Sequence, residues 1–413
     1  MRRRLRIARY HTPVTTERGS PLSGRWDLDP EAVFLNHGSF GACPHAVLQH
    51  QSELRARLER QPVDFFVRQY YPLLDDARHT LAAFLSADAE GLAFVPNATT
   101  GVNSVVRSME LNADDELLVS DHAYNACRNA LDYVAERASA KVVVVPIPFP
   151  VASDEEIITA VTDRVTDRTR MLLIDHVTSA TGLVLPIARI VAELASRGID
   201  TLVDGAHAPG MIPLDLDALG ASYYTGNCHK WICAPKGAAF LWVRKDLRTQ
   251  VRPATISHGA NMPETERSRF RHEFDWVGTT DPTAWLSVPK ALSVMGSMLP
   301  GGWPEVMETN RALVLQARAM LADRLELELP CPDEMIGSIA SLQLTEGPAN
   351  QPSPLYEDPL QVRLWEKDRI EVPIGPFPVP PQRILRISAQ LYNGMGDYEI
   401  LADALARELQ TGD

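Results

Sequence analysis

The chain has 413 residues, of which 45% are hydrophobic and 23% charged, an ordinary globular composition that excludes disorder, collagen and coiled coil. Its formal net charge of −13 argues against a nucleic-acid surface, and no run of 18 apolar residues could span a membrane. The five cysteines are scattered rather than arranged as a disulfide framework, and the leader MRRRLRIARYHT lacks the apolar core of a secretory signal. We therefore expect a cytoplasmic protein with a frayed arginine-rich leader.

Short apolar runs alternate with amphipathic helical stretches between about 78 and 245. The runs lie at 92–95, 117–120, 142–145, 171–174, 201–203 and 238–243. Helical stretches with apolar residues three and four apart, such as 131–138 and 187–196, lie between them. This alternation predicts an α/β fold with a mostly parallel sheet covered by helices on both faces. Ligands bind such sheets beyond the carboxyl ends of the strands, so a functional motif should directly follow a strand.

The pattern changes from about residue 290. A helical run at 312–327 leads into strand-like pieces and a proline-rich segment at 373–382. We predict a large domain over 45–290, a smaller α+β domain over 291–413, and an irregular segment over 1–44 that packs on the small domain.

Three segments that each follow a predicted strand carry groups of complementary chemistry. Lys230 follows the strand-like SYYTG, Asp204 follows the run 201–203, and Thr99 and Thr100 precede a helix that is predicted to begin near Gly101. Backbone N–H groups, two hydroxyls and the positive end of the helix dipole suit a phosphate at the last of these.

Together the three segments predict a site for pyridoxal phosphate (PLP). Lys230 would form the imine with the cofactor aldehyde, Asp204 would keep the pyridine nitrogen protonated, and the Thr-Thr-Gly segment would bind the phosphate. Each residue also has a structural interpretation: a surface lysine, a helix-capping aspartate and, for His207, a core histidine. These alternatives stay open at this point.

The motifs that carry these residues resemble a known family. DGAHAPG (204–210), TGNCHKW (225–231) and NATTGVN (97–103) resemble class V aminotransferase-fold enzymes, a group that includes cysteine desulfurases. LNHGSFGACP (35–44), HEFDWVGTTDPTAWLSV (272–288) and RIEVPI (369–374) resemble isopenicillin N epimerase and its relatives, which include lyases acting on hercynylcysteine sulfoxide. The resemblance covers about 33–405 and implies the PLP-dependent transferase fold type I, with a mostly parallel seven-stranded sheet in the large domain.

The resemblance also implies roles for individual residues. Lys230 forms the Schiff base, Asp204 pairs with the pyridine nitrogen and His207 contacts the 3′-oxygen. The phosphate is bound by a set of residues at two strand ends, namely Ala98, Thr99, Thr100, Thr225 and His229. Thr279 would reach the phosphate of a partner subunit, which implies a homodimer with the active site at its interface.

Substrate contacts are implied for a second group. Arg386 matches the arginine that receives the α-carboxylate of an amino-acid substrate, and the alternating pattern ILRIS places it on a strand. Asn36 and His37 lie in a stretch that relatives place near the substrate, and the structural alternative is a Gly-containing turn whose polar residues cap the local backbone. Either His122 or Tyr124 would stack on the cofactor ring, and Tyr124 matches the epimerase and lyase relatives better.

One departure from the family bears on the reaction. Cysteine desulfurases carry a nucleophilic cysteine shortly before the carboxylate-binding arginine, whereas residues 355–385 contain none here, so desulfurase activity is disfavoured. Cys228 and Cys233 lack the second pair that a zinc site needs, and we predict no metal. The favoured activity is epimerisation at an amino-acid α-carbon by Lys230 and Tyr124, and the alternative is β-elimination from a cysteine-derived thioether or sulfoxide. Transamination and a cofactor-free scaffold are further, less favoured interpretations.

Overall fold

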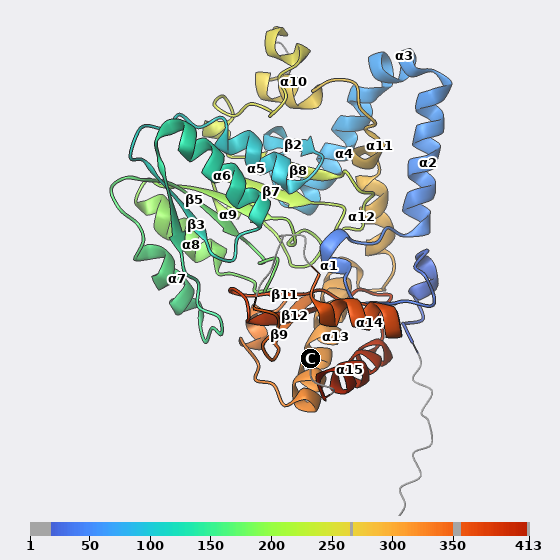
Figure 1. Ribbon diagram of the computed structural model, residues 1–413. Coiled ribbons are helices and arrows are strands. Elements are labelled where there is room, and N and C mark those ends of the chain that lie inside the picture. Colours follow the sequence, from blue (N-terminus) through green and yellow to red (C-terminus); the bar gives the residue numbers. More distant parts are fainter. Residues whose placement is uncertain (1–17, 265–266, 350–356, 411–413) are drawn as a thin grey trace, which may run out of the picture.

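The computed structural model describes residues 18–264, 267–349 and 357–410, so the arginine-rich leader lies outside the described residues. A central sheet with its covering helices forms the larger part, and a smaller sheet with three long helices lies below it in Figure 1. None of the helices in the described ranges is long and apolar enough to cross a bilayer.

The central sheet has seven strands in the order β2-β8-β7-β6-β5-β3-β4. Their bounds are β2 Leu92–Val95, β3 Glu116–Ser120, β4 Lys141–Val145, β5 Thr169–Asp175, β6 Asp200–Gly205, β7 Tyr223–Asn227 and β8 Ala239–Val243. β8 runs antiparallel to both of its neighbours, and the pairs among β7, β6, β5, β3 and β4 are parallel. The prediction of a mostly parallel sheet built from these apolar runs is confirmed.

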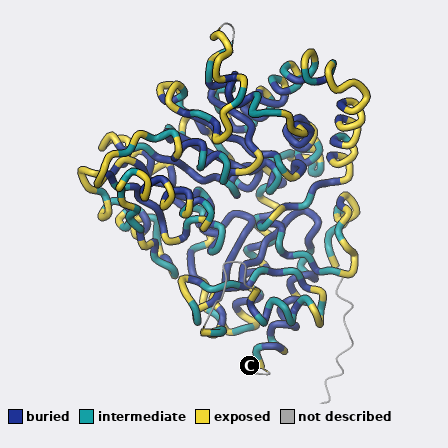
Figure 2. Tube along the Cα trace, turned by 45° about the horizontal axis from the view of Figure 1, so that its top comes forward, coloured by how far each residue is buried: buried dark blue, intermediate teal, exposed yellow. Residues whose placement is uncertain are grey.

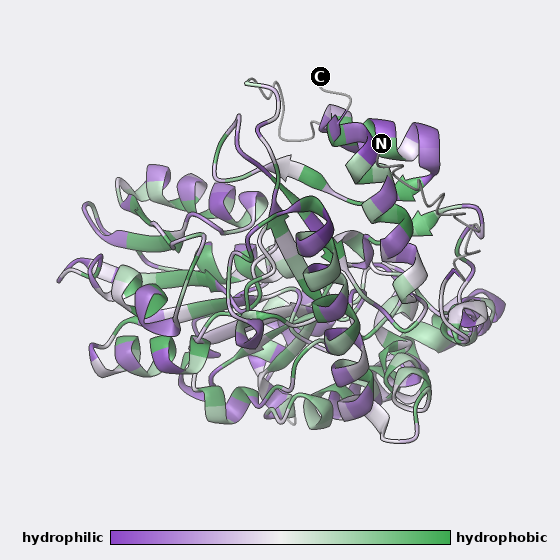
Figure 3. Cartoon of the chain, turned by 90° about the horizontal axis from the view of Figure 1, so that it is seen from below, coloured by the Kyte–Doolittle hydropathy of each residue, from purple (hydrophilic) through white to green (hydrophobic). Residues whose placement is uncertain are grey.

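Alternate residues of each strand pack on opposite faces of this sheet. Leu117 and Val119 join the apolar cluster beneath α5 and α6, whereas Leu118 points into the larger cluster beneath α4, α7, α8 and α12. Because both faces are covered, the strands read as continuous apolar runs. Figure 2 shows the buried interior in dark blue, and Figure 3 shows hydrophobic residues along the strands with hydrophilic ones on the outer helix faces.

The helices of this part range from single turns to about four turns. Their bounds are α1 His37–Phe40, α2 His45–Arg60, α3 Pro62–Asp64, α4 Tyr70–Phe84, α5 Ala98–Val106, α6 Asn125–Ala138, α7 Asp154–Thr162, α8 Ile187–Ser196, α9 Leu216–Leu219, α10 Arg269–Asp275, α11 Thr283–Leu286 and α12 Val288–Gly296.

The second sheet is antiparallel with the order β11-β12-β9. It comprises β9 Ile339–Gln343, β11 Ile374–Pro376 and β12 Arg383–Ser388, accompanied by α13 Gly302–Leu325, α14 Pro359–Asp368 and α15 Met395–Gln410. The N-terminal segment joins this part, because β1 (Val33–Phe34) pairs in parallel with β10 (Ile370–Glu371). The position of the domain boundaries remains a prediction.

Two helix starts differ from those expected. α5 begins at Ala98 rather than near Gly101, because the side chain of Asn97 caps it and turns the Thr-Thr-Gly segment into its first turn. α13 begins at Gly302 rather than at 312. Gly301, Gly302 and Pro304 are turn signals that obscure the start of this helix, although Trp303, Val306 and Met307 keep the helical apolar spacing.

Candidate active site

Lys230 lies in the loop that joins β7 to the antiparallel β8. The N–H groups of Cys228 and His229 both donate to the carbonyl of Ala238 at 3.0 Å and close the base of this loop. The N–H of Cys233 donates to the carbonyl of Lys230 at 3.0 Å, and Cys233 has a left-handed φ of 60°. The loop therefore holds Lys230 in a defined tight turn, at the carboxyl end of a strand as the sequence predicts.

The amine of Lys230 contacts His207, 2.9 Å from its Nε2 atom. The indole N–H of Trp231 donates to the other nitrogen of His207, Nδ1, at 3.4 Å. Burial, followed by the positive charge of Arg386, lowers the pKa of Lys230 to about 7. A substantial fraction of this amine is therefore unprotonated near neutral pH, which is the form that attacks an aldehyde.

Asp204 ends β6 with a buried side chain. Its Oδ1 accepts from the N–H of Ala206 at 3.0 Å, and its Oδ2 accepts from the thiol of Cys127 at 3.2 Å. Burial raises its pKa. A buried carboxyl group with one weak thiol donor on Oδ2 suits pairing with a protonated ring nitrogen, which would stabilise its charged form.

A second carboxyl group lies beside Asp204 and was missed by the sequence reasoning. Asp175 ends β5 in direct register with Asp204 and is also buried. Its Oδ2 atom has no hydrogen-bond partner among the described residues, and burial followed by the charge of Asp204 holds its pKa well above the usual value. The run MLLIDH carries the same strand-end aspartate signal as LVDGAH, so this residue was detectable.

The first turn of α5 offers one unused backbone donor. The N–H of Thr100 donates to the Asn97 side chain at 2.8 Å, and the N–H of Ala98 donates to Oδ1 of Asn227 at 2.9 Å. Within the described chain the N–H of Thr99 has no partner, and the Thr99 hydroxyl interacts with the thiol of Cys127, the residue that contacts Asp204. The structure thus brings Thr99 close to Asp204, and adds Asn227, three residues before Lys230, as a group that sequence reasoning overlooked.

Thr225 and His229 lie nearby, and the side chain of each already donates a hydrogen bond to a backbone carbonyl. The hydroxyl of Thr225 donates to the carbonyl of Phe240 at 2.8 Å inside the sheet, so the structure gives its predicted phosphate contact no support. Nδ1 of His229 donates to the carbonyl of Ala238 at 2.9 Å, which leaves Nε2 for a ligand. Burial lowers the pKa of His229 to about 4, and an adjacent phosphate dianion would raise it.

Arg386 lies on the central strand of the small sheet, as predicted. Its guanidinium donates to the carbonyl of Ser179 at 2.5 Å, to Oδ1 of Asn36 at 3.1 Å and to the hydroxyl of Ser39 at 2.8 Å. A guanidinium has five N–H donors, so two remain for a carboxylate. Asn36 therefore holds Arg386, the group expected to meet the substrate.

Tyr124 is half exposed at the start of α6, and its phenol is close enough to Arg386 to raise the pKa of the guanidinium against the larger lowering caused by burial. His122 is buried instead. Its Nδ1 contacts the hydroxyl of Thr181 at 2.8 Å, its Nε2 contacts the carbonyl of Ile147 at 3.2 Å, and Phe377 packs edge-on against the ring with centroids 4.6 Å apart. Both residues remain candidates for stacking on the cofactor.

The structure does not place His37 where a substrate could use it. Its Nε2 donates to the carbonyl of Lys230 at 3.0 Å, and its Nδ1 accepts from the hydroxyl of Tyr392 at 2.9 Å. The ring is fully buried, and burial lowers its pKa to about 3. The expected substrate contact therefore lacks a free ring nitrogen, and His37 instead holds the backbone of Lys230.

Thr279 is exposed on the loop between α10 and α11, after Gly278 with φ of 121°. No contact within the described residues joins its side chain to Lys230. An exposed threonine suits a role toward another chain, and that role remains a prediction.

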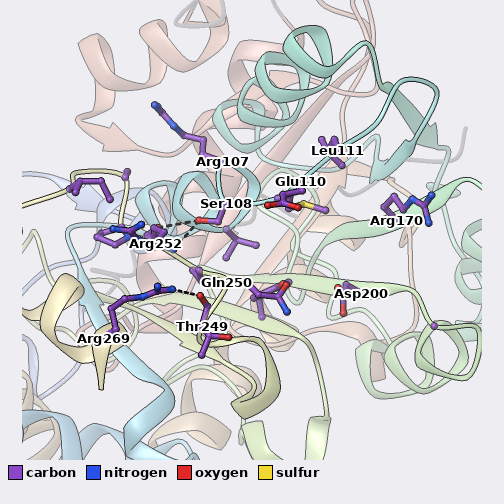
Figure 4. Close-up of a pocket in the computed structure, with 18 of the residues that line it drawn as sticks. Arg107, Ser108, Glu110, Leu111, Arg170, Asp200, Thr249, Gln250, Arg252 and Arg269 are labelled. Carbon is purple, nitrogen blue, oxygen red and sulfur yellow. Dashed lines mark hydrogen bonds between the residues drawn. The ribbon is translucent and has the colours of Figure 1, made fainter. Parts of the chain in front are cut away.

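A pocket of about 920 Å³ lies away from these residues (Figure 4). It is lined by Thr169, Asp200 and Tyr223, which begin β5, β6 and β7, whereas ligands of open α/β sheets bind at the carboxyl ends. Three of its four arginines are also paired with carboxylates, namely Arg170 with Asp115, and Arg252 and Arg269 with Glu273. We therefore assign the active site to the Lys230 region.

The chain belongs to the class V aminotransferase family, whose model matches residues 42–351. It is accordingly an enzyme with PLP as its cofactor. The isopenicillin N epimerase of Streptomyces clavuligerus is 35% identical, over 92% of this chain and 96% of the relative. A probable chloroplastic L-cysteine desulfhydrase of Arabidopsis thaliana is 32% identical, over 91% of this chain and 83% of the relative.

The fold is also that of solved PLP enzymes of fold type I. The crystal structure of the cysteine desulfurase CsdA from Escherichia coli matches with a TM-score of 0.76 at 20% identity, covering 94% of this chain and 98% of that one. The residues described above fit the cofactor, because a partly unprotonated lysine amine, a buried carboxyl group and an unused helix N-terminal donor lie together at the strand ends.

Proposed function

We propose that this protein epimerises or racemises an amino-acid substrate at its α-carbon. One observation carries the proposal: the arginine suited to the α-carboxylate interacts electrostatically with two proton-carrying groups from different elements. The charge of Arg386 acts on the amine of Lys230, and the phenol of Tyr124 acts on Arg386. The 35% and 37% identity to isopenicillin N epimerases of Streptomyces clavuligerus and Amycolatopsis lactamdurans supports the same reaction.

Each residue would perform a separate part of the reaction. When bound, PLP supplies the electron sink that stabilises negative charge at the substrate α-carbon. Arg386 binds the α-carboxylate and orients the α-hydrogen, and Asp204 holds a proton at the ring nitrogen. Lys230 removes the α-proton on one face, and Tyr124 returns a proton on the other. Thr99, Asn227 and His229 would hold the phosphate. The N–H and hydroxyl of Thr100 both donate to Asn97, and the N–H of Ala98 donates to Asn227, so their predicted phosphate contacts have no free donor in this arrangement.

The alternative is a C–S β-lyase, which uses the same base but expels sulfur instead of returning a proton. The 32% identity to L-cysteine desulfhydrases favours it. Desulfurase chemistry is disfavoured, because all five cysteines are buried and burial raises the pKa of each thiol. A persulfide needs an accessible thiolate, and none of these five provides one.

The test is to incubate the holoenzyme with single enantiomers of a panel of amino acids and thioethers in D₂O. An epimerase is expected to incorporate deuterium at the α-carbon and to yield both enantiomers. Tyr124→Phe should preserve exchange into one enantiomer while lowering inversion by about 10²-fold or more. Pyruvate and a released thiol, with no inversion, would establish the lyase instead and refute the epimerase.

We expect Arg386→Ala to lower kcat/KM by about 10²-fold, chiefly through KM, because a charge-assisted carboxylate contact is lost. Arg383→Ala is an unsuitable control, since that side chain is buried in an ion pair with Asp358 at 2.8 Å. Arg189→Ala is the better control, because the side chain of Arg189 is exposed and pairs with Glu155. If amines without a carboxylate lose as much kcat/KM in the Arg386 variant as amino acids do, Arg386 does not bind the carboxylate.

A homodimer belongs to the same proposal. Thr279 is exposed in the single chain, and we propose that it contacts the cofactor phosphate of a partner subunit. Light scattering should then give twice the mass of the chain, and a monomer that retains full activity would contradict the shared site. A cytoplasmic location is also proposed, supported by five unpaired cysteines.

A further inference from the structure

Trp231 is linked to the amine of Lys230 through one intervening side chain. Its indole N–H donates to Nδ1 of His207 at 3.4 Å, and Nε2 of His207 lies 2.9 Å from the Lys230 amine. Trp231 is fully buried and His207 is 2% exposed, so water does not compete strongly for these contacts. The three groups therefore form a short buried chain of hydrogen bonds.

The direction of these bonds follows from the chemistry of the indole. Trp Nε1 can only donate, so Nδ1 of His207 must accept and carries no proton. In a neutral imidazole the proton then lies on Nε2, which donates. The partner of Nε2 is the Lys230 amine, which must accept and therefore must offer its lone pair. An ammonium group has no lone pair and does not fit this arrangement.

The surroundings keep His207 neutral. Burial lowers its pKa well below the usual value, and the positive charge of Arg386 acts in the same direction. The charged or titratable groups that act on Lys230 come from four further elements, namely Arg386 of β12, Asp204 of β6, Asp175 of β5 and Cys127 of α6. Arg386 disfavours the ammonium form of Lys230, whereas the two carboxyl groups and the thiol favour it. Because these effects oppose one another, the hydrogen bond with His207 influences the protonation state of Lys230.

We propose that Trp231 is a positioning residue that fixes the tautomer of His207, and that this tautomer holds the Lys230 amine unprotonated and ready to react with an aldehyde. The inference rests on the proposed function only in taking Lys230 as the cofactor-binding lysine. Without the indole N–H, His207 can place its proton on Nδ1 and accept from an ammonium group instead. Trp231 would then influence reactivity without touching the cofactor or the substrate.

The test compares Trp231→Phe with Trp242→Phe in the full-length protein freed of cofactor. Trp242 is a matched control, because it is 3% exposed and its Nε1 has no hydrogen-bond partner among the described residues. The pH midpoint of Lys230 acylation is measured by competitive isotopic labelling and peptide mass spectrometry. We expect a midpoint near 7 in the parent and in Trp242→Phe, and a rise of about one pH unit in Trp231→Phe. Equal midpoints in the two variants would overturn the proposal.

A measurement on the unmutated protein covers the case in which Trp231→Phe fails to fold. Nitrogen-15 NMR of histidine-labelled protein, with His207 assigned by loss of its signal in His207→Gln, reports which ring nitrogen is protonated. A proton on Nε2 supports the proposal, and a proton on Nδ1 refutes it. Borohydride reduction of the holoenzyme separately shows whether PLP is joined to residue 230, so failure of the proposed function is distinguishable from failure of this inference.

Discussion

Lys230→Ala is expected to abolish turnover, lowering kcat by about 10³-fold or more, because the variant lacks the amine that we propose both joins the cofactor and acts as the base at the α-carbon. The visible absorbance of the bound cofactor should also shift, since no amine of the protein can then join the aldehyde. The fold should persist, because the side chain contributes one hydrogen bond, to His207, and little apolar packing. Steady-state kinetics, absorbance spectra and thermal unfolding check these three expectations.

The control for this variant is Lys245→Ala, which removes an exposed lysine in the short 3-10 helix Lys245–Leu247 after β8. It should retain parental kinetics and spectrum. Turnover of Lys230→Ala within about tenfold of the parent would contradict the assignment of Lys230 as the catalytic lysine. Loss of the folded state in Lys230→Ala would instead be visible as a shifted unfolding transition.

Asp204→Ala is expected to lower kcat by about 10²-fold and to weaken cofactor retention, because the variant lacks the buried carboxyl group that we propose keeps the ring nitrogen protonated. Its loss also leaves the thiol of Cys127 without this acceptor. Dialysis followed by cofactor quantification measures retention, and single-turnover exchange of the α-hydrogen measures the chemical step. Both effects should appear together.

Asp200→Asn provides the comparison, because Asp200 begins the same strand and lies at its opposite end. It should change neither retention nor exchange. If Asp204→Ala leaves both unchanged while lowering the free energy of unfolding, the carboxyl group is structural and the site assignment fails. Asp204→Asn keeps the shape of the side chain and separates loss of charge from loss of packing.

Most strands of the central sheet were predictable because they are buried on both faces and contain an unbroken apolar run, as Leu92–Val95 does. The edge strand β4 is less buried, and β7 has the sequence YYTGN. Asp204 and Thr99 were detectable because they lie at or just after the end of such a run, and Lys230 because it follows the strand-like SYYTG. The cap by Asn97 was also readable, since an asparagine before a helix is a strong start signal. This part of the site is encoded locally along the chain.

The contacts that orient these residues could not be predicted in the same way. His37 lies 193 positions from the Lys230 carbonyl to which it donates, and Asn36 lies 350 positions from Arg386. The stretch that contains Asn36 and His37 indicated polar residues in a turn, but the hydrogen-bond partners of these two residues are set by tertiary packing. The predicted phosphate contact of Thr225 lacks support for a similar reason, since its hydroxyl donates to the carbonyl of Phe240 inside the sheet.

The hold of His37 and Tyr392 on the backbone of Lys230 has a consequence for biosynthesis. His37, which precedes the central sheet in the sequence, donates to the carbonyl of Lys230. The hydroxyl of Tyr392, which follows the central sheet in the sequence, orients His37. During translation the central sheet can assemble before Tyr392 has left the ribosomal exit tunnel, yet the lysine would still lack its support. Vitamin B6 should therefore be captured productively only once Tyr392 has been synthesised and has packed against His37.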